Sequence, residues 1–127
     1  MPSLVVRDAQ LSAFARARFL AWMTRHLETH FPEQCEALGA DGVRHTLHTA
    51  IAKAHGHGFT REPDVCRFVD LVFTFGLTFD DDERLPWARA TLAALKAAGG
   101  TPAIEPLHRA AMLYLRDLML GTDGPPR

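Results

Sequence analysis

Residues 64–79 read DVCRFVDLVFTFGLTF, and this stretch decides the fold. On a helical wheel its apolar residues cover nearly the whole circumference, and only a narrow polar stripe of Arg67, Asp70 and Thr74 interrupts them. A helix that is apolar on almost every side lies inside a protein or against a partner. The run is too short and too interrupted to span a bilayer. The stretch therefore predicts a buried central helix over 61–77.

Three side chains of this helix are expected to share one inward face. Phe68, Val72 and Phe75 follow the i, i+4, i+7 spacing of a single helical face. We expect all three to be buried.

Glycine and proline separate the remaining helices, which are expected over 9–30, 32–38, 42–55, 86–98 and 102–120. The alternation of apolar and polar residues that is typical of strands is absent. The pattern predicts an all-α, single-domain orthogonal bundle of about five to six helices around the central one. The first helix is expected to carry a wide apolar arc, made of Leu11, Phe14, Ala15, Phe19, Leu20, Trp22, Met23 and Leu27.

Composition limits the domain count and the class of partner. The chain has 127 residues, 47% of them apolar, which suits one compact domain. We expect this helical domain to cover 1–120, with a disordered tail over 121–127. The 14 basic and 15 acidic residues give a net charge of −1, which does not favour nucleic acid or an anionic membrane. No membrane insertion is expected.

The N-terminus and the cysteines indicate a cytoplasmic protein. The first residues, MPSLVVRD, lack the charged and long apolar regions of a signal peptide. Cys35 and Cys66 fit neither a disulfide framework nor a CxxC pair.

The histidines do not form a recognisable metal motif. His26 and His30 are one helical turn apart, as are His45 and His48, but the first pair does not belong to an HExxH sequence. We expect surface histidines and no metal or other cofactor.

No sequence feature predicts catalysis. The chain contains no GxSxG, P-loop or GxGxxG motif. The acidic run Asp80–Glu83 lacks the glycine and glutamate that an EF-hand places at its sixth and twelfth positions. We therefore expect a protein that is not an enzyme.

The most favoured contact surface runs from the acidic loop into the next helix. Aromatic anchors beside charged residues are typical of binding surfaces. In the alternative arrangement the two aromatics fold inward and join neighbouring helices, and the exposed faces of the first and last helices are the next candidates. The predicted protein-binding residues are Phe79, Asp80, Asp81, Asp82, Glu83 and Trp87.

A family resemblance lies mainly in the middle of the chain, at 64–76, 79–80 and 85–88, with further matches at 30–33, 37–39 and 58–60. Over about residues 4–118 the chain resembles small helical bacterial proteins that are encoded beside type VI secretion genes, near those for spike, PAAR-like tip and effector proteins. The resemblance implies a setting rather than a residue-level mechanism.

In that setting we expect a cytoplasmic adaptor or chaperone that holds an effector or a spike-tip protein. The alternatives are an immunity protein that neutralises a toxin, or a helical domain that binds a small molecule or a metal. The sequence leaves the partner and the oligomeric state open.

Overall fold

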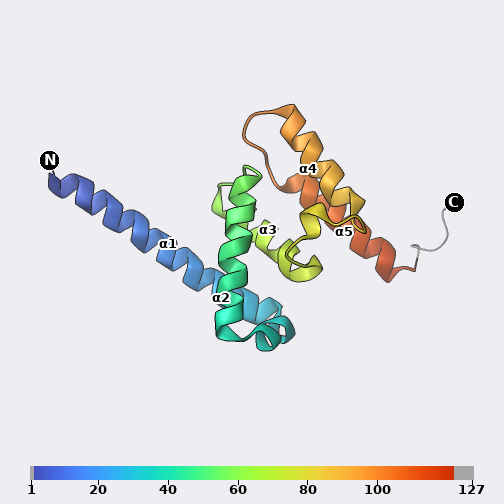
Figure 1. Cartoon of the computed structure of the whole chain (residues 1–127), viewed down its shortest axis with the longest axis horizontal. Helices are drawn as coiled ribbons and strands as arrows, with labels where there is room; N and C mark the ends of the chain where they lie inside the picture. Colours follow the sequence, from blue (N-terminus) through green and yellow to red (C-terminus); the bar gives the residue numbers. More distant parts are fainter. Residues whose placement is uncertain (1, 122–127) are drawn as a thin grey trace. The chain divides into compact units, whose positions relative to one another are not determined.

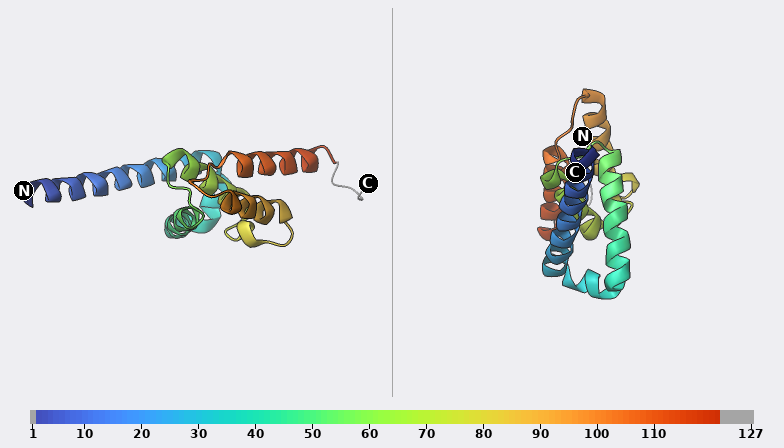
Figure 2. Two further views of the ribbon diagram at one scale, coloured as in Figure 1. Left: turned by 90° about the horizontal axis from the view of Figure 1, so that it is seen from above. Right: turned by 90° about the vertical axis from the view of Figure 1, so that its left-hand side faces the viewer.

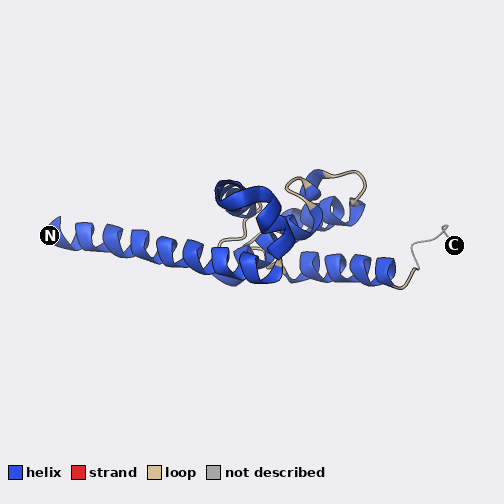
Figure 3. Cartoon of the chain, turned by 90° about the horizontal axis from the view of Figure 1, so that it is seen from below, coloured by secondary structure: helices blue, strands red, loops and turns tan. Residues whose placement is uncertain are grey.

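A computed structural model of the chain describes residues 2–121, with their side chains from residue 10 onward. This part consists of helices joined by loops and turns, and it contains no strand (Figure 3). The prediction of an all-α fold with five to six helices is confirmed. Residues 122–127, most of the predicted tail, lie outside the described residues. The elements are α1 (Pro2–His30), α2 (Pro32–Gly56), α3 (Glu62–Phe75), the 3-10 helix η1 (Phe79–Asp81), α4 (Pro86–Ala98) and α5 (Glu105–Met119).

The helices group into two compact units, residues 1–47 and 48–127. The prediction of one domain over 1–120 stays a prediction. In the first unit, α1 is a single uninterrupted helix (Figure 1). The break predicted at Gly39 is present, because its φ of 74° is not helical and α2 bends there.

The apolar arc predicted for α1 is only partly buried. Met23 and Leu27 are fully buried, whereas Leu11, Phe14 and Trp22 are 59%, 63% and 47% exposed. The arc is therefore covered over only part of its length. Periodicity identifies an apolar face of a helix, but it does not reveal whether another element covers that face along its full length.

In the second unit, α3 has the predicted buried character. Its first-turn carboxylates and its early proline suit a helix start, since they complement the helix dipole and fix φ. The helix runs from Glu62 to Phe75, slightly shorter than the predicted 61–77, with Arg61 at the N-cap and Gly76, which has a φ of 112°, at the C-cap. The side chains buried along α3 are Asp64, Val65, Phe68, Val69, Leu71, Val72 and Phe73.

The predicted inward face of α3 is confirmed for Phe68 and Val72, which are 0% and 3% exposed. Phe75 is only half-buried, so that part of the prediction is wrong. Phe75 is the last residue of the helix, and the chain turns away at Gly76. Its ring contacts Phe79, Trp87 and Tyr114, but the residue is only half-buried.

The helix α4 packs along α5 (Figures 1 and 2). In addition, α4 contacts η1, and α5 contacts α3. The bounds of α4 match the prediction of 86–98, because Pro86 begins the helix and Gly99 ends it. The last helix begins at Glu105, later than the predicted residue 102, with Pro106 in its first turn. None of the described helices is long and apolar enough to cross a membrane.

A tight turn joins α2 to α3. Gly58 has a φ of 93°, a region that residues with a Cβ rarely adopt. A Cβ added to Gly58 would lie 3.0 Å from Cγ of Pro102. The turn thus requires glycine both for its backbone angle and for the space beside Pro102.

Candidate functional site

The predicted contact segment begins in the interior of the second unit rather than on its surface. Phe79, the first residue of η1, is 1% exposed. The expectation that its ring offers exposed apolar area is wrong, and the alternative inward arrangement is the one observed for this residue. Trp87 is half-buried, and its indole N–H is buried without an acceptor among the described residues.

These two aromatics belong to a continuous cluster of rings. Phe79 connects Phe68, at 5.3 Å between ring centroids, with Trp87, at 6.4 Å. Phe75 meets Trp87 edge-on at 5.2 Å. Such contacts add to the burial of apolar area and fix the orientation of the rings. We call this set the aromatic cluster; it consists of Phe59, Phe68, Phe75, Phe79, Trp87 and Tyr114.

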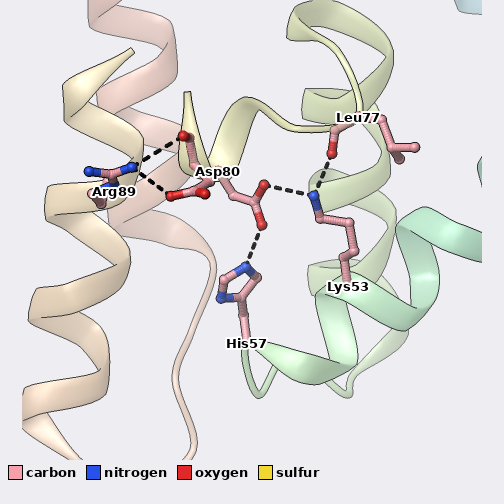
Figure 4. A network of polar contacts seen from close by, with 6 residues as sticks. Lys53, His57, Leu77, Asp80 and Arg89 are labelled. Atoms are coloured by element: carbon pink, nitrogen blue, oxygen red, sulfur yellow. Dashed lines mark hydrogen bonds and ion pairs between the residues drawn. The ribbon is translucent and has the colours of Figure 1, made fainter. Parts of the chain in front are cut away.

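Asp80 follows Phe79 and points toward the end of α2, where two cationic or ionisable side chains meet it (Figure 4). Lys53 Nζ donates to Asp80 Oδ1 at 2.8 Å and also to the backbone carbonyl of Leu77 at 2.5 Å. His57 Nε2 lies 2.7 Å from Asp80 Oδ2. We call Lys53, His57 and Asp80 the carboxylate clamp, because they hold the turn after α3 against the end of α2.

Burial and hydrogen bonding act on the carboxyl group of Asp80 in opposite directions. The side chain is only 8% exposed, and desolvation alone would raise its pKa. The hydrogen bonds from His57 and Lys53, with the positive charge of Lys53, outweigh desolvation and leave the pKa of Asp80 below its ordinary value. Asp80 is therefore an ionised, paired group that stabilises the fold.

In the rest of the acidic run, Asp81 and Asp82 are more exposed but are also paired. Asp81 accepts a 2.6 Å hydrogen bond from Arg89 (Figure 4), and Asp82 accepts one of 2.9 Å from Arg84. Hydrogen bonds from Arg84 also keep the pKa of Asp82 low. Asp81 and Glu83 are exposed. A role for this run in partner binding stays a prediction, and it now depends on these two carboxylates rather than on Phe79 or Asp80.

The clamp suits anchoring better than catalysis. A carboxylate that orients a histidine also occurs in nucleophilic active sites. Here, however, the carboxylate is shared with Lys53, which in turn binds the Leu77 carbonyl, so that each contact joins two backbone segments. The thiol of Cys66 is not activated either, because burial and the nearby charge of Asp70 raise its pKa to about 11.

A separate surface feature lies on α5. The inner side of this helix buries Leu107 and Ala111. Its outer side is not polar, as the outer side of a surface helix usually is. It exposes four large apolar side chains together with two arginines. We call this set the α5 outer face; it consists of Arg109, Met112, Leu113, Arg116, Met119 and Leu120.

Neither the carboxylate clamp nor the α5 outer face was predicted from the sequence. Lys53 lies 27 residues from Asp80 in the chain, and no local pattern connects the two. His57 is one of the histidines that are expected at the surface. For α5 the sequence contains a signal, since Met112, Leu113 and Met119 fall outside the helical face that Leu107 and Ala111 share.

Comparison of the chain with models of protein families, with curated proteins and with solved structures finds no match.

Proposed function

We propose that this chain is a non-enzymatic protein-binding module that holds its partner on the α5 outer face. The observation that carries the proposal is the exposure of Met112, Leu113, Met119 and Leu120, which are 42%, 45%, 84% and 67% exposed. Contiguous apolar side chains that remain exposed on a folded protein mark interaction sites.

The composition of the α5 outer face suits a protein partner. Methionine and arginine are enriched in protein–protein interfaces. The unbranched methionine side chain also adapts to partners of different shape. Arg109 lies one turn before the apolar residues and Arg116 lies among them, so both supply hydrogen-bond donors beside the apolar side chains.

The family resemblance supplies the biological setting of the proposal. In that setting the module is a cytoplasmic adaptor or chaperone for a type VI effector or spike-tip protein. An immunity protein would use the same kind of surface to cover a toxin. Deletion distinguishes the two roles, since loss of a chaperone abolishes secretion, whereas loss of an immunity protein leaves the cell sensitive to its sister cells.

The binding surface is tested by co-purification with the product of the neighbouring effector gene. The double variant Met112→Glu/Met119→Glu places two charges on the α5 outer face, and we expect it to reduce capture at least tenfold. Leu38→Glu is the matched control, because it changes another apolar side chain of similar exposure, 44%, on a different helix. The control should capture the effector as the wild type does.

Both variants should retain the wild-type melting temperature, since the substituted side chains are already exposed. Undiminished capture by the α5 double variant would remove the α5 outer face as the binding surface.

A further inference from the structure

An exposed stripe on α1 combines aromatic, aliphatic and basic side chains. Leu11, Phe14, Arg18, Trp22 and Arg25 recur every three or four residues, and at about 100° per residue they fall within an arc of about 80°. All five are exposed. We call this set the α1 stripe. Phe, Trp and Arg are the residues that interfaces favour, and Trp and Arg are the ones that most often dominate binding energy.

The charge of the α1 stripe is positive. Residues 10–27 contain Arg16, Arg18 and Arg25 but no aspartate or glutamate. Within the described part of the chain, neither Arg18 nor Arg25 takes part in an ion pair. Both guanidinium groups are therefore available to a partner that brings carboxylates.

The positions of the two arginines restrict which partner shapes can bind the α1 stripe. Arg18 and Arg25 lie seven residues apart within the apolar stripe, not at its borders. From Leu11 to Arg25 the stripe extends along about 21 Å of helix, or four turns. A second helix of four turns laid along it would need apolar residues at the same spacing, with two acidic residues one heptad apart.

A second copy of the chain does not meet that requirement. Arg18 lies midway between Leu11 and Arg25, so antiparallel pairing of two stripes would place Arg18 against its own copy. Parallel pairing would bring both arginines beside their copies. Like charges in such positions are destabilising.

An anionic membrane also fits less well. A helix that lies on a membrane has a wide apolar face with basic residues on the opposite, polar face. Here the arginines lie among the exposed apolar side chains of the stripe rather than on the opposite face.

We propose that the α1 stripe binds an acidic amphipathic helix of a partner protein, with one carboxylate opposite Arg18 and another opposite Arg25. The inference rests on the proposed function, because it names the chemistry of a segment that the binding module holds.

The test uses a display library of amphipathic helices about four turns long. Two positions in the apolar seam of each helix, one heptad apart, vary among Glu, Gln and Lys. Selection on the full-length wild-type chain should enrich Glu at both positions at least tenfold over Lys. Selection on Arg18→Glu/Arg25→Glu should reverse the preference toward Lys, and selection on Phe14→Ser should enrich neither.

Arg16→Glu is the matched control, since it changes the same charge on the opposite side of α1 and should keep the preference for Glu. Circular dichroism should show the wild-type melting temperature for every variant. A wild-type selection without charge preference, or a preference that survives the charge reversal, would overturn the inference. The inference would also be overturned if no helix is enriched and the wild-type chain binds phosphatidylserine vesicles, with that binding lost in Arg18→Glu/Arg25→Glu.

These outcomes are separable from those for the proposed function. If no helix is enriched but Met112→Glu/Met119→Glu loses the effector, only the α1 inference fails. If acidic helices are enriched and the α5 double variant still captures the effector, the α5 outer face fails and the α1 inference stands.

Discussion

His57 Nε2 lies 2.7 Å from Asp80 Oδ2, across 23 residues of sequence. This contact and the one from Lys53 to the other carboxylate oxygen join the end of α2 to the turn after α3. Buried Phe79 lies in the same segment, so the carboxylate clamp and the aromatic cluster both hold it. The predictions that follow test how much each contact contributes.

Removing the charge of Asp80 should destabilise the protein more than removing that of its neighbour. Asp80→Asn weakens two hydrogen bonds to charged or ionisable partners at a site only 8% exposed, and we expect a loss of about 2 kcal/mol in the free energy of unfolding. Asp81→Asn breaks an ion pair whose carboxylate is 81% exposed, and it should cost less than about 1 kcal/mol. Urea denaturation measures both values. Equal losses of unfolding free energy in the two variants would mean that Asp80 contributes no more to stability than an exposed ion pair does.

The contribution of Asp80 should disappear in acid. Because the pKa of Asp80 is lowered in the folded protein, its stabilisation is fully present above the ordinary carboxyl pKa and is lost as pH falls through the lower folded value. The difference in unfolding free energy between wild type and Asp80→Asn should therefore shrink as pH falls below about 4. Asp82 and Glu105, whose pKa values are also lowered, are common to both proteins and cancel in the difference. A difference that grows in acid would contradict this assignment.

The two phenylalanines of α3 should differ in their contribution to stability. Phe68 is fully buried between Phe59 and Phe79, and Phe68→Ala should cost about 3–5 kcal/mol through lost burial and a residual cavity. Phe75→Ala should cost clearly less, because that residue is only half-buried. Thermal and urea unfolding of both variants give the comparison. A Phe75→Ala protein less stable than Phe68→Ala would place the centre of the core near α4 and α5 instead.

Two glycines two residues apart should respond oppositely to alanine. Gly58→Ala combines a φ of 93° with a contact of 3.0 Å to the Pro102 ring, and we expect it to lose about 1–3 kcal/mol. Gly56 ends α2 and has no atom within 4 Å of an added Cβ. Gly56→Ala should therefore be neutral or stabilise by up to about 1 kcal/mol. The melting temperatures of the two variants test this contrast. A similar decrease in both would contradict the prediction.

The thiol of Cys66 should react slowly in the folded protein. A pKa of about 11, against an ordinary 9.0, leaves roughly a hundredfold less thiolate near pH 8. Allowing for the greater nucleophilicity of a more basic thiolate, we expect alkylation by iodoacetamide about tenfold slower than for an ordinary thiol. Mass spectrometry of a Cys35→Ser variant isolates the reaction of Cys66. The same rate in native buffer and in urea would show that the fold does not suppress its ionisation.

The sequence by itself determined the features that depend on neighbouring residues. Pro86 and Gly99 set the bounds of α4, and Gly39 set the bend of α2, because their backbone preferences are local. The all-round apolar pattern of residues 64–79 likewise identified α3 as a buried helix.

Only the tertiary structure decided which apolar and charged residues are used inside the fold and which stay outside. Phe79 turned inward and Asp80 joined Lys53 and His57 because of contacts between segments far apart in sequence. Conversely, Leu11 and Phe14 belong to the predicted apolar arc of α1 yet remain exposed. Periodicity defines a face of a helix, whereas its burial depends on which other element packs against it.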